Sequence, residues 1–206
     1  MRSLRYRLSL SIVALTCATA CHHAAPQPVK TASSKSGPKS AVPVFTEADV
    51  EFMQGMIGHH TQAIEMVKLL KTRTTRDDMK FLGLRIEVAQ TDEIKTMRNW
   101  LADRKQSVPG DEDYQMMMQM PDMAMPGMLT QAEMTQLAAA KGADFDRMFL
   151  EGMIKHHQGA LTMVAKLIAS PGAAQEPAVF AFASDVQADQ SAEINRMRAM
   201  RATMGK

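Results

Sequence analysis

A stretch of sixteen residues occurs twice in the chain and decides its fold. Residues 52–67 read FMQGMIGHHTQAIEMV and residues 149–164 read FLEGMIKHHQGALTMV, and nine of the sixteen positions are identical. In both copies the apolar residues recur at intervals of three and four, which predicts an amphipathic helix. The same helix, with the same pair of adjacent histidines, is therefore expected in two places.

Each copy is followed by a second matching segment. The pattern Q-x-x-E-I-x-x-M-R spans residues 90–98 and returns at residues 190–198. The chain thus contains two helical hairpins, and because one hairpin cannot bury its own apolar face, the two are predicted to pack as an all-α four-helix bundle. Glycine disfavours a helix by about 1 kcal/mol relative to alanine, so we expect the helical glycines where helices approach closely. These glycines are Gly55, Gly58, Gly83, Gly152 and Gly159.

Capping residues set the limits of the first hairpin, which spans about residues 45–108. Thr46 and Asp49 form a variant capping box, so the first helix is expected to begin there and to end near residue 72. The second helix is expected over about residues 75–104. Pro109 and Gly110 then end the hairpin.

The second hairpin spans about residues 143–206, with helices expected over residues 144–169 and from Pro177 to about residue 203. Proline suits the first turn of a helix. No segment of the chain has a convincing strand pattern.

A methionine-rich linker, residues 111–129, joins the two hairpins. Because it contains Pro121, Pro126 and Gly127, residues 111–127 are predicted to form a loop and not a buried helix. Thr130 and Glu133 form a capping box, which predicts a short helix through residue 140.

The N-terminal residues 1–20 have the features of a signal peptide. Three arginines precede an apolar run at residues 8–16, and Ala18-Thr19-Ala20 supplies a cleavage signature. The run is shorter than the roughly 20 residues that span a bilayer. Cleavage after Ala20 would make Cys21 the new N-terminal residue, as in a bacterial lipoprotein. Ala18, however, stands where a lipobox usually has leucine. Lipidation of Cys21 and simple secretion are therefore both left open.

Residues 21–44, rich in Ala, Pro, Ser and Lys, are predicted to be a flexible tether. The mature chain would keep at most one cysteine, because Cys17 leaves with the signal, so no internal disulfide is expected. Removal of three arginines and no acids changes the formal net charge from +2 to +2 − 3 = −1. This nearly neutral chain lacks the basic face that nucleic-acid binding needs.

The repeated histidines suggest a metal centre. Carboxylate di-iron bundles use a Glu-x-x-His motif, which the sequence lacks; Met56-x-x-His59 and Met153-x-x-His156 stand in its place. Residues three apart share a helix face, and a thioether in place of a carboxylate favours Cu(I) over iron. Copper, as Cu(I) more than Cu(II), is therefore the predicted metal. Candidate ligands are His59, His60, His156, His157, Met56 and Met153, together with Met66 and Met163, which are also suited to core packing.

Adjacent histidines cannot be equivalent, because neighbouring residues diverge by about 100° around a helix axis. One imidazole of each pair should point inward and the other toward a neighbouring helix or the surface. Metal-bound histidines usually donate their second ring N–H to an acceptor, and Glu93 and Glu193 are the predicted acceptors.

The linker concentrates a second set of sulfur atoms. Seven of the chain's twenty methionines fall between residues 116 and 128. We interpret them as capture sites for Cu(I); a protein-binding or lid loop, and quenching of oxidants at exposed sulfurs, are the alternatives. These methionines are Met116, Met117, Met118, Met120, Met123, Met125 and Met128.

The paired motifs resemble those of the domain-of-unknown-function 305 family, which are bacterial exported proteins with a ferritin-like helical fold. Its hallmark M-x-x-H-H-x-x-A-I-x-M matches residues 56–66, and F-x-x-x-M-I-x-H-H-x-G-A-[IL]-x-M matches residues 149–163. The resemblance covers roughly residues 45–203. It implies a ferritin-like bundle, and a protein that is periplasmic, attached to the cell surface or secreted. Some relatives are similar to copper-resistance proteins. At the position before the last methionine of the motif, many members of the family carry an acidic residue. The first half of this chain has Glu65 at that position, whereas the second half has Thr162.

These observations favour an exported copper-binding protein that sequesters copper or transfers it to another envelope copper-handling protein. They favour a binding protein over an enzyme. A metal-dependent oxidase or peroxide-handling enzyme is the first alternative. An envelope interaction module that docks a partner through the linker is the second. Membrane contact is expected only through a lipid anchor, and the oligomeric state is left open.

Overall fold

The computed structural model describes residues 45–120 and 125–204. They form six helices: α1 (Glu47–Arg73), α2 (Asp77–Asp103), α3 (Asp111–Gln119), α4 (Gln131–Ala139), α5 (Gly142–Ala169) and α6 (Pro177–Thr203). The predicted signal peptide, Cys21, the tether and Met123 lie outside the described residues. The four long helices begin and end within a few residues of the predicted limits, and the described part of the chain contains no strand.

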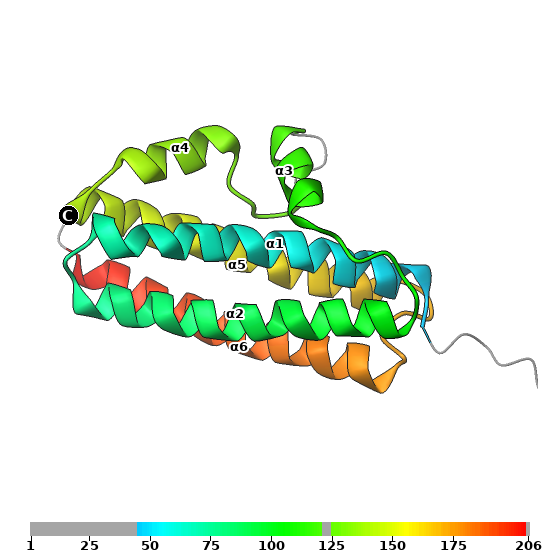
Figure 1. The fold of residues 1–206 in the computed structure, drawn as a ribbon. Helices are drawn as coiled ribbons and strands as arrows, with labels where there is room; N and C mark the ends of the chain where they lie inside the picture. Colours follow the sequence, from blue (N-terminus) through cyan, green and yellow to red (C-terminus); the bar gives the residue numbers. More distant parts are fainter. Residues whose placement is uncertain (1–44, 121–124, 205–206) are drawn as a thin grey trace, which may run out of the picture. The chain divides into compact units, whose positions relative to one another are not determined.

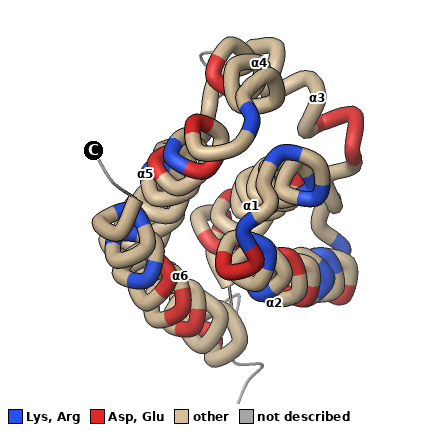
Figure 2. Tube along the Cα trace, turned by 90° about the vertical axis from the view of Figure 1, so that its left-hand side faces the viewer, with Lys and Arg blue, Asp and Glu red and all other residues tan. Residues whose placement is uncertain are grey.

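The four long helices form the predicted bundle of two hairpins. α1 packs on α2, α5 packs on α6, and the two hairpins meet mainly along α1 and α5. Figure 1 shows that α1 and α5 run in opposite directions through the middle of the molecule, with α2 and α6 on one side and α3 and α4 on the other. The linker therefore forms a third layer over the α1–α5 pair (Figure 2).

Local signals explain the helix starts. The Thr46 side chain caps the Asp49 N–H and Asp49 in turn accepts from the Thr46 backbone at 2.7 Å, so the variant capping box is formed. Thr130 and Glu133 form theirs in the same way at the start of α4. Pro177 occupies the first turn of α6. These contacts satisfy backbone N–H groups that the helix itself leaves free.

The prediction of a loop over residues 111–127 is wrong for its first half, because residues 111–119 form α3. Three acidic residues occupy its first turn, where they complement the positive end of the helix dipole. The Asp113 carboxylate also accepts from the Gly110 N–H at 2.7 Å. Pro121 comes after the helix has ended, so it breaks nothing. Methionine itself is a good helix former.

Two large apolar clusters form the core between the four long helices, and a third, smaller cluster lies under the linker. One large cluster contains Phe52, Met56 and Trp100, and the other contains Met66, Phe149 and Met153. On α1 and α5 the clusters are separated by the paired histidines, and on α2 and α6 by the repeated Q-x-x-E segments. A polar layer thus crosses the middle of the bundle, with contributions from all four long helices. No helix in the described ranges is long and apolar enough to cross a membrane.

Candidate metal centre

The four histidines predicted to bind metal come together in the polar layer. His59 and His60 on α1 and His156 and His157 on α5 are all 0% exposed. The rings of His59 and His156 face each other with centroids 3.8 Å apart and planes tilted by 38°. Adjacent rings within each pair are 6.2 Å apart at 56° in both halves. The repeat in the sequence is therefore also a repeat in geometry.

The outer histidine of each pair lies against a glutamate of its own hairpin. His157 Nε2 donates to Glu193 Oε2 at 2.6 Å, and His60 Nε2 lies 2.8 Å from Glu93 Oε2 without the orientation of a hydrogen bond. Both predicted acceptors thus stand beside the imidazoles for which they were proposed. Neither His60 nor His157 reaches the surface, so in each pair it is the neighbouring helix that receives the second imidazole.

The inner histidines are held by backbone carbonyls. His59 Nε2 lies 3.1 Å from the Pro126 oxygen in the linker, and His156 Nε2 lies 2.9 Å from the His59 oxygen. A carbonyl oxygen can only accept, so the proton of each ring sits on Nε2. The Nδ1 atom then carries a free lone pair.

All four Nδ1 atoms are buried and have no hydrogen-bond partner among the described residues. A buried polar atom without a partner costs roughly 1–3 kcal/mol. Four such atoms at matching positions in both halves form a set of nitrogen donors in the middle of the core.

Burial keeps the inner imidazoles neutral. Desolvation, followed by the nearby His60, lowers the pKa of His59 from 6.5 to about 3, whereas its bond to Pro126 acts in the opposite direction. Desolvation and the neighbouring His59 likewise hold the pKa of His156 well below its ordinary value. Metal-binding histidines must be unprotonated, so these two nitrogens meet that condition even in mild acid.

Four predicted sulfur ligands lie in the adjoining clusters. Met56, Met153 and Met66 are completely buried, and Met163 nearly so. Met56 belongs to one apolar cluster and Met153 to the other, so these two residues lie on opposite sides of the polar layer. Counting only histidine, cysteine and carboxylate groups, the described ranges contain no set of three placed to hold a metal.

The linker methionines are divided between surface and interior. Met116 is 57% and Met120 48% exposed, whereas Met117 and Met128 are buried beside Tyr114. Met118 receives the Gln62 amide N–H at 3.2 Å, and Met125 lies over α1, where a Cβ on Gly55 would stand 3.1 Å from its Sδ.

The helical glycines mark where the linker packs, which corrects part of the prediction. A Cβ on Gly159 would overlap the Pro126 oxygen, and one on Gly58 would lie 3.2 Å from the Met117 methyl group. Gly83, whose Cβ would overlap Leu70 of α1, fits the expectation of close helix packing. Gly152 on α5 fits it in part, because its Cβ would lie 3.3 Å from the Met66 methyl group of α1 as well as 3.2 Å from Leu129. The sequence could not reveal this, because the linker was predicted to be a loop and no sequence feature indicated which helices it would pack against.

Sequence reasoning missed the residues that fasten the linker to α1. The Gln62 amide donates to the Leu129 oxygen at 2.8 Å and accepts from the Leu129 N–H at 2.7 Å. The Tyr114 hydroxyl donates to Glu65 at 2.6 Å, and burial together with Glu65 raises the Tyr114 pKa. Both α1 residues differ from their counterparts in α5, Gly159 and Thr162, and that difference between the halves was the available signal.

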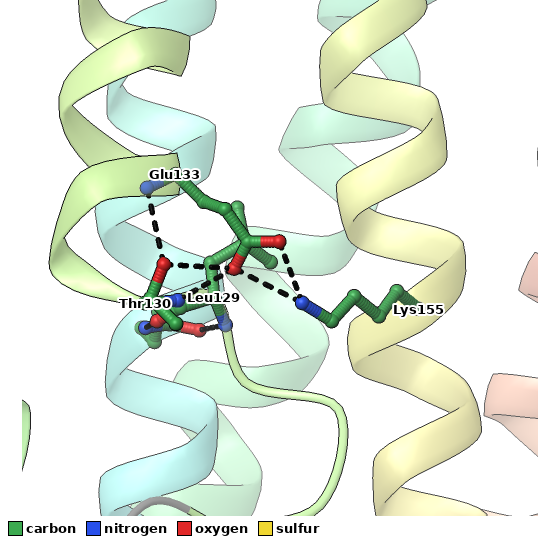
Figure 3. A network of polar contacts seen from close by, with 5 residues as sticks. Leu129, Thr130, Glu133 and Lys155 are labelled. Carbon is green, nitrogen blue, oxygen red and sulfur yellow. Dashed lines mark hydrogen bonds and ion pairs between the residues drawn. The ribbon is translucent and has the colours of Figure 1, made fainter. Parts of the chain in front are cut away.

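On the α5 side an ion pair holds the first turn of α4, which directly follows the linker. Figure 3 shows Lys155 reaching the Glu133 carboxylate, at 2.7 and 3.0 Å from its two oxygens, while Glu133 also closes the capping box of Thr130. Contacts from both central helices thus fix the linker over the histidines.

The fold and this centre define a class: an all-α bundle of duplicated hairpins with a buried histidine layer. Residues 49–201 match the family described as "Domain of unknown function (DUF305)", and the chain belongs to that family. The likeness that the paired motifs indicated is confirmed.

Solved structures of the family have the same fold. A DUF305 protein of Streptomyces coelicolor, described as secreted, is 27% identical over 77% of this chain and 94% of its own, with a TM-score of 0.64. CopM in its Cu(I)-bound form is 28% identical over 77% of this chain and 98% of its own, with a TM-score of 0.60. CopM has also been solved with Cu(II), at 29% identity and a TM-score of 0.59.

One curated relative matches a shorter region. The uncharacterized protein L153 of Acanthamoeba polyphaga mimivirus is 39% identical over 57 residues, which are 28% of this chain and 38% of that protein. The match therefore spans well under half of that relative.

Proposed function

We propose that the protein binds copper outside the cytoplasm, for sequestration or transfer. His59, His60, His156 and His157 supply imidazole nitrogens, and Met56 and Met153 supply thioether sulfurs. Met66 and Met163 extend the sulfur set. Copper is the ligand, and the protein itself carries out no chemical conversion.

The observation that carries the proposal is the set of four buried Nδ1 atoms without partners in the described chain. Three of the rings direct Nε2 at an oxygen, and the fourth, His60, has its Nε2 2.8 Å from a Glu93 oxygen, so Nδ1 is left for a metal. Hydrogen bonding of the second ring nitrogen is the usual support for a metal-bound histidine. Glu193 gives this support to His157, and Glu93 lies within reach of His60 Nε2 to give it.

The donor set favours copper over iron. Imidazole suits copper, and thioether selects Cu(I) in particular. The carboxylates nearest the histidines are directed at ring nitrogens. A family neighbour with the same fold, CopM, has been solved with Cu(I) and with Cu(II) bound, which supports copper for this chain as well.

The linker methionines provide a route of capture. Met116 and Met120 offer exposed sulfurs, and a hollow of about 660 Å³ between α3 and α4 is lined by Met117, Met118 and Met128. We infer that Cu(I) binds first to these thioethers, including Met123 and Met125, and then moves inward. Thioethers do not titrate, so capture would continue in acid.

The location follows from the N-terminal segment. Residues 1–20 direct export, residues 21–44 act as a tether, and Cys21 becomes the site of a lipid anchor or simply the new N-terminus. The secreted description of the Streptomyces coelicolor relative supports export. Fractionation of cells that express the full chain or its Cys21→Ala variant tests the anchor, which requires the wild type alone to enter the membrane fraction. The partner that we propose to receive the metal is another envelope copper-handling protein.

The central test is a copper titration of the exported protein. Cu(I) is supplied in competition with a chromogenic chelator, and the wild type is compared with the variant in which all four buried histidines become asparagine. Asparagine is chosen because its amide keeps a polar group near the ring position. We expect the variant to lose the tightest copper equivalents.

A matched control comes from the other two histidines of the chain, His22 and His23. Their replacement by asparagine should leave the tight equivalents unchanged. X-ray absorption should report both nitrogen and sulfur neighbours of the bound copper. Copper affinity that survives loss of the four buried histidines would refute their role, and oxygen or peroxide consumption by the copper-loaded protein would favour the enzymatic alternative.

A further inference from the structure

The polar layer contains two buried amides that stand outside the ligand set proposed above. Gln90 on α2 and Gln190 on α6 are each 2% exposed, and within the described ranges neither their oxygens nor their nitrogens have a hydrogen-bond partner. Apart from Asp146 Oδ1, every buried side-chain nitrogen or oxygen without a partner in this part of the chain belongs to these amides or to the four histidines. Buried polar groups are nearly always paired, so this concentration of unpaired ones indicates that the layer binds something.

Each amide lies one turn before a glutamate that contacts a histidine. Gln90 precedes Glu93 by three residues. Gln190 precedes Glu193 in the same way. Residues three apart share a face of a helix, and the oxygen and nitrogen of both amides are buried. Both amides are therefore directed into the core.

The contact between His60 and Glu93 shows what lies opposite the first amide. His60 Nε2 is 2.8 Å from Glu93 Oε2, and α1 and α2 are antiparallel neighbours (Figure 1). Three residues back along α2 correspond to three residues forward along α1, which places Gln90 at the level of Ala63. Ala63 is 0% exposed, and its side chain is only a methyl group, so it leaves room for the amide.

The second hairpin repeats this arrangement. His157 Nε2 donates to Glu193 Oε2 at 2.6 Å, and the same step along α6 and α5 places Gln190 at the level of Ala160. Ala160 is also 0% exposed. A buried amide opposite a small side chain is therefore a feature of both repeats.

Each amide also lies on the same side of the histidine layer as one predicted sulfur ligand. Ala63 belongs to the same apolar cluster as Met153, and Ala160 belongs to the same cluster as Met56. Each side of the layer thus has a thioether from one hairpin and an amide from the other.

We propose that Gln90 and Gln190 are further ligands of the copper centre and that their amide oxygens bind the metal when it is Cu(II). Cu(II) suits nitrogen and oxygen donors, whereas a thioether selects Cu(I). With both kinds of donor on either side of the imidazoles, the centre holds copper in either oxidation state. This inference rests on the proposed copper binding and adds to it the residues that admit the oxidised ion.

The test compares Cu(II) and Cu(I) binding by the exported protein and by its Gln90→Leu/Gln190→Leu variant. Leucine is close to glutamine in size and offers no donor atom. We expect the variant to bind Cu(II) about tenfold more weakly or worse, since loss of a contact with a charged group changes affinity by at least this factor. Its Cu(I) affinity should be that of the wild type. Each ion is supplied in competition with a chelator of that oxidation state.

Two further measurements separate a ligand from a structural amide. Electron paramagnetic resonance of bound Cu(II) should differ between the wild type and the leucine variant, because an oxygen donor has left the metal. Leucine also removes buried polar groups that lack a partner in the described chain, so the metal-free variant should unfold at a higher urea concentration than the wild type. An amide that only holds the core together would give a lower one.

Two more variants make the result specific. Gln187 lies on α6 one turn before Gln190 but is exposed, so Gln187→Leu should bind both ions as the wild type does. Gln90→Met/Gln190→Met exchanges oxygen for sulfur at the same positions and should weaken Cu(II) binding without weakening that of Cu(I).

Unchanged Cu(II) affinity in the leucine variant, or an equal loss of Cu(I) and Cu(II) affinity, would overturn this inference while leaving the proposed copper binding in place. A wild type that binds neither ion would refute the proposed function itself, and this inference with it.

Discussion

The buried His59 should make the metal-free protein sensitive to acid. Its pKa falls from 6.5 to about 3 in the folded state because of burial and the adjacent His60. Below pH 6.5 the unfolded chain binds a proton at this position that the folded chain does not take up. The stabilising contribution is thus complete above pH 6.5 and is lost as the pH falls toward 3.

The size of the loss follows from the difference in pKa. At about pH 4.5, two units below the ordinary value, His59 alone should lower the free energy of unfolding by about 2.7 kcal/mol. The lowered pKa of His156 acts in the same direction. A loss of this size is a large fraction of the stability of a typical domain.

Urea unfolding of the metal-free wild type and of His59→Gln, at about pH 7 and pH 4.5, measures this contribution. Glutamine keeps an N–H for the Pro126 oxygen and does not titrate. Titration of the carboxylates changes the free energy of unfolding of both proteins equally, so this change cancels when the wild type and the variant are compared. We expect the wild type to lose about 2.7 kcal/mol more than the variant between the two pH values. An equal loss in both proteins would show that His59 titrates normally in the folded state and would refute the reasoning.

Three other changes test the linker and the outer histidines. Gly159→Ala forces a methyl group against the Pro126 oxygen and should cost about 1–3 kcal/mol in urea unfolding; a neutral result would mean that the linker moves freely. Tyr114→Phe removes the bond to Glu65 and should cost about 1.5–3 kcal/mol, with faster hydrogen exchange in α3 as the local readout; unchanged exchange would count against this contact as the anchor. Glu193→Gln preserves the shape beside His157 but removes the charge, so the fold should persist while copper affinity falls about 10- to 100-fold; unaltered affinity would exclude Glu193 from metal support.

The four long helices could be predicted because their signals are local. Thr46 with Asp49, Thr130 with Glu133, and Pro177 each act within one turn of the chain, and the repeated apolar spacing extends the helices between them. The bundle followed from the need of each hairpin to bury one face. These signals require no knowledge of distant contacts.

The linker could not be predicted in the same way. Pro121 and Gly127 were interpreted as features of the whole segment, although a proline ends a helix only at its own position. The docking of the linker depends on Gln62 and Gly159. These residues occupy equivalent positions in the two copies of the repeat and are 97 residues apart in the chain. The residues next to Gln62 or Gly159 in the sequence do not indicate that the linker, which comes between them in the chain, packs against both.

The site was predictable in composition and less so in geometry. The sequence identified the histidine pairs and Glu93 and Glu193, because they recur at matched positions. It did not reveal that the inner imidazoles bond to carbonyl oxygens, since backbone acceptors leave no trace in the sequence. Gln90 and Gln190 also recur, but only their burial without partners makes them informative.

A single linker lies over two matched halves, and this has an evolutionary consequence. In a dimer of identical hairpins every substitution would appear on both sides of the axis. In one chain, residue 62 can clamp Leu129 while its counterpart, residue 159, is small enough for Pro126 to pass. The duplicated histidines have thus acquired unequal surroundings, so two ions bound in this layer would be distinguishable by affinity and order of filling.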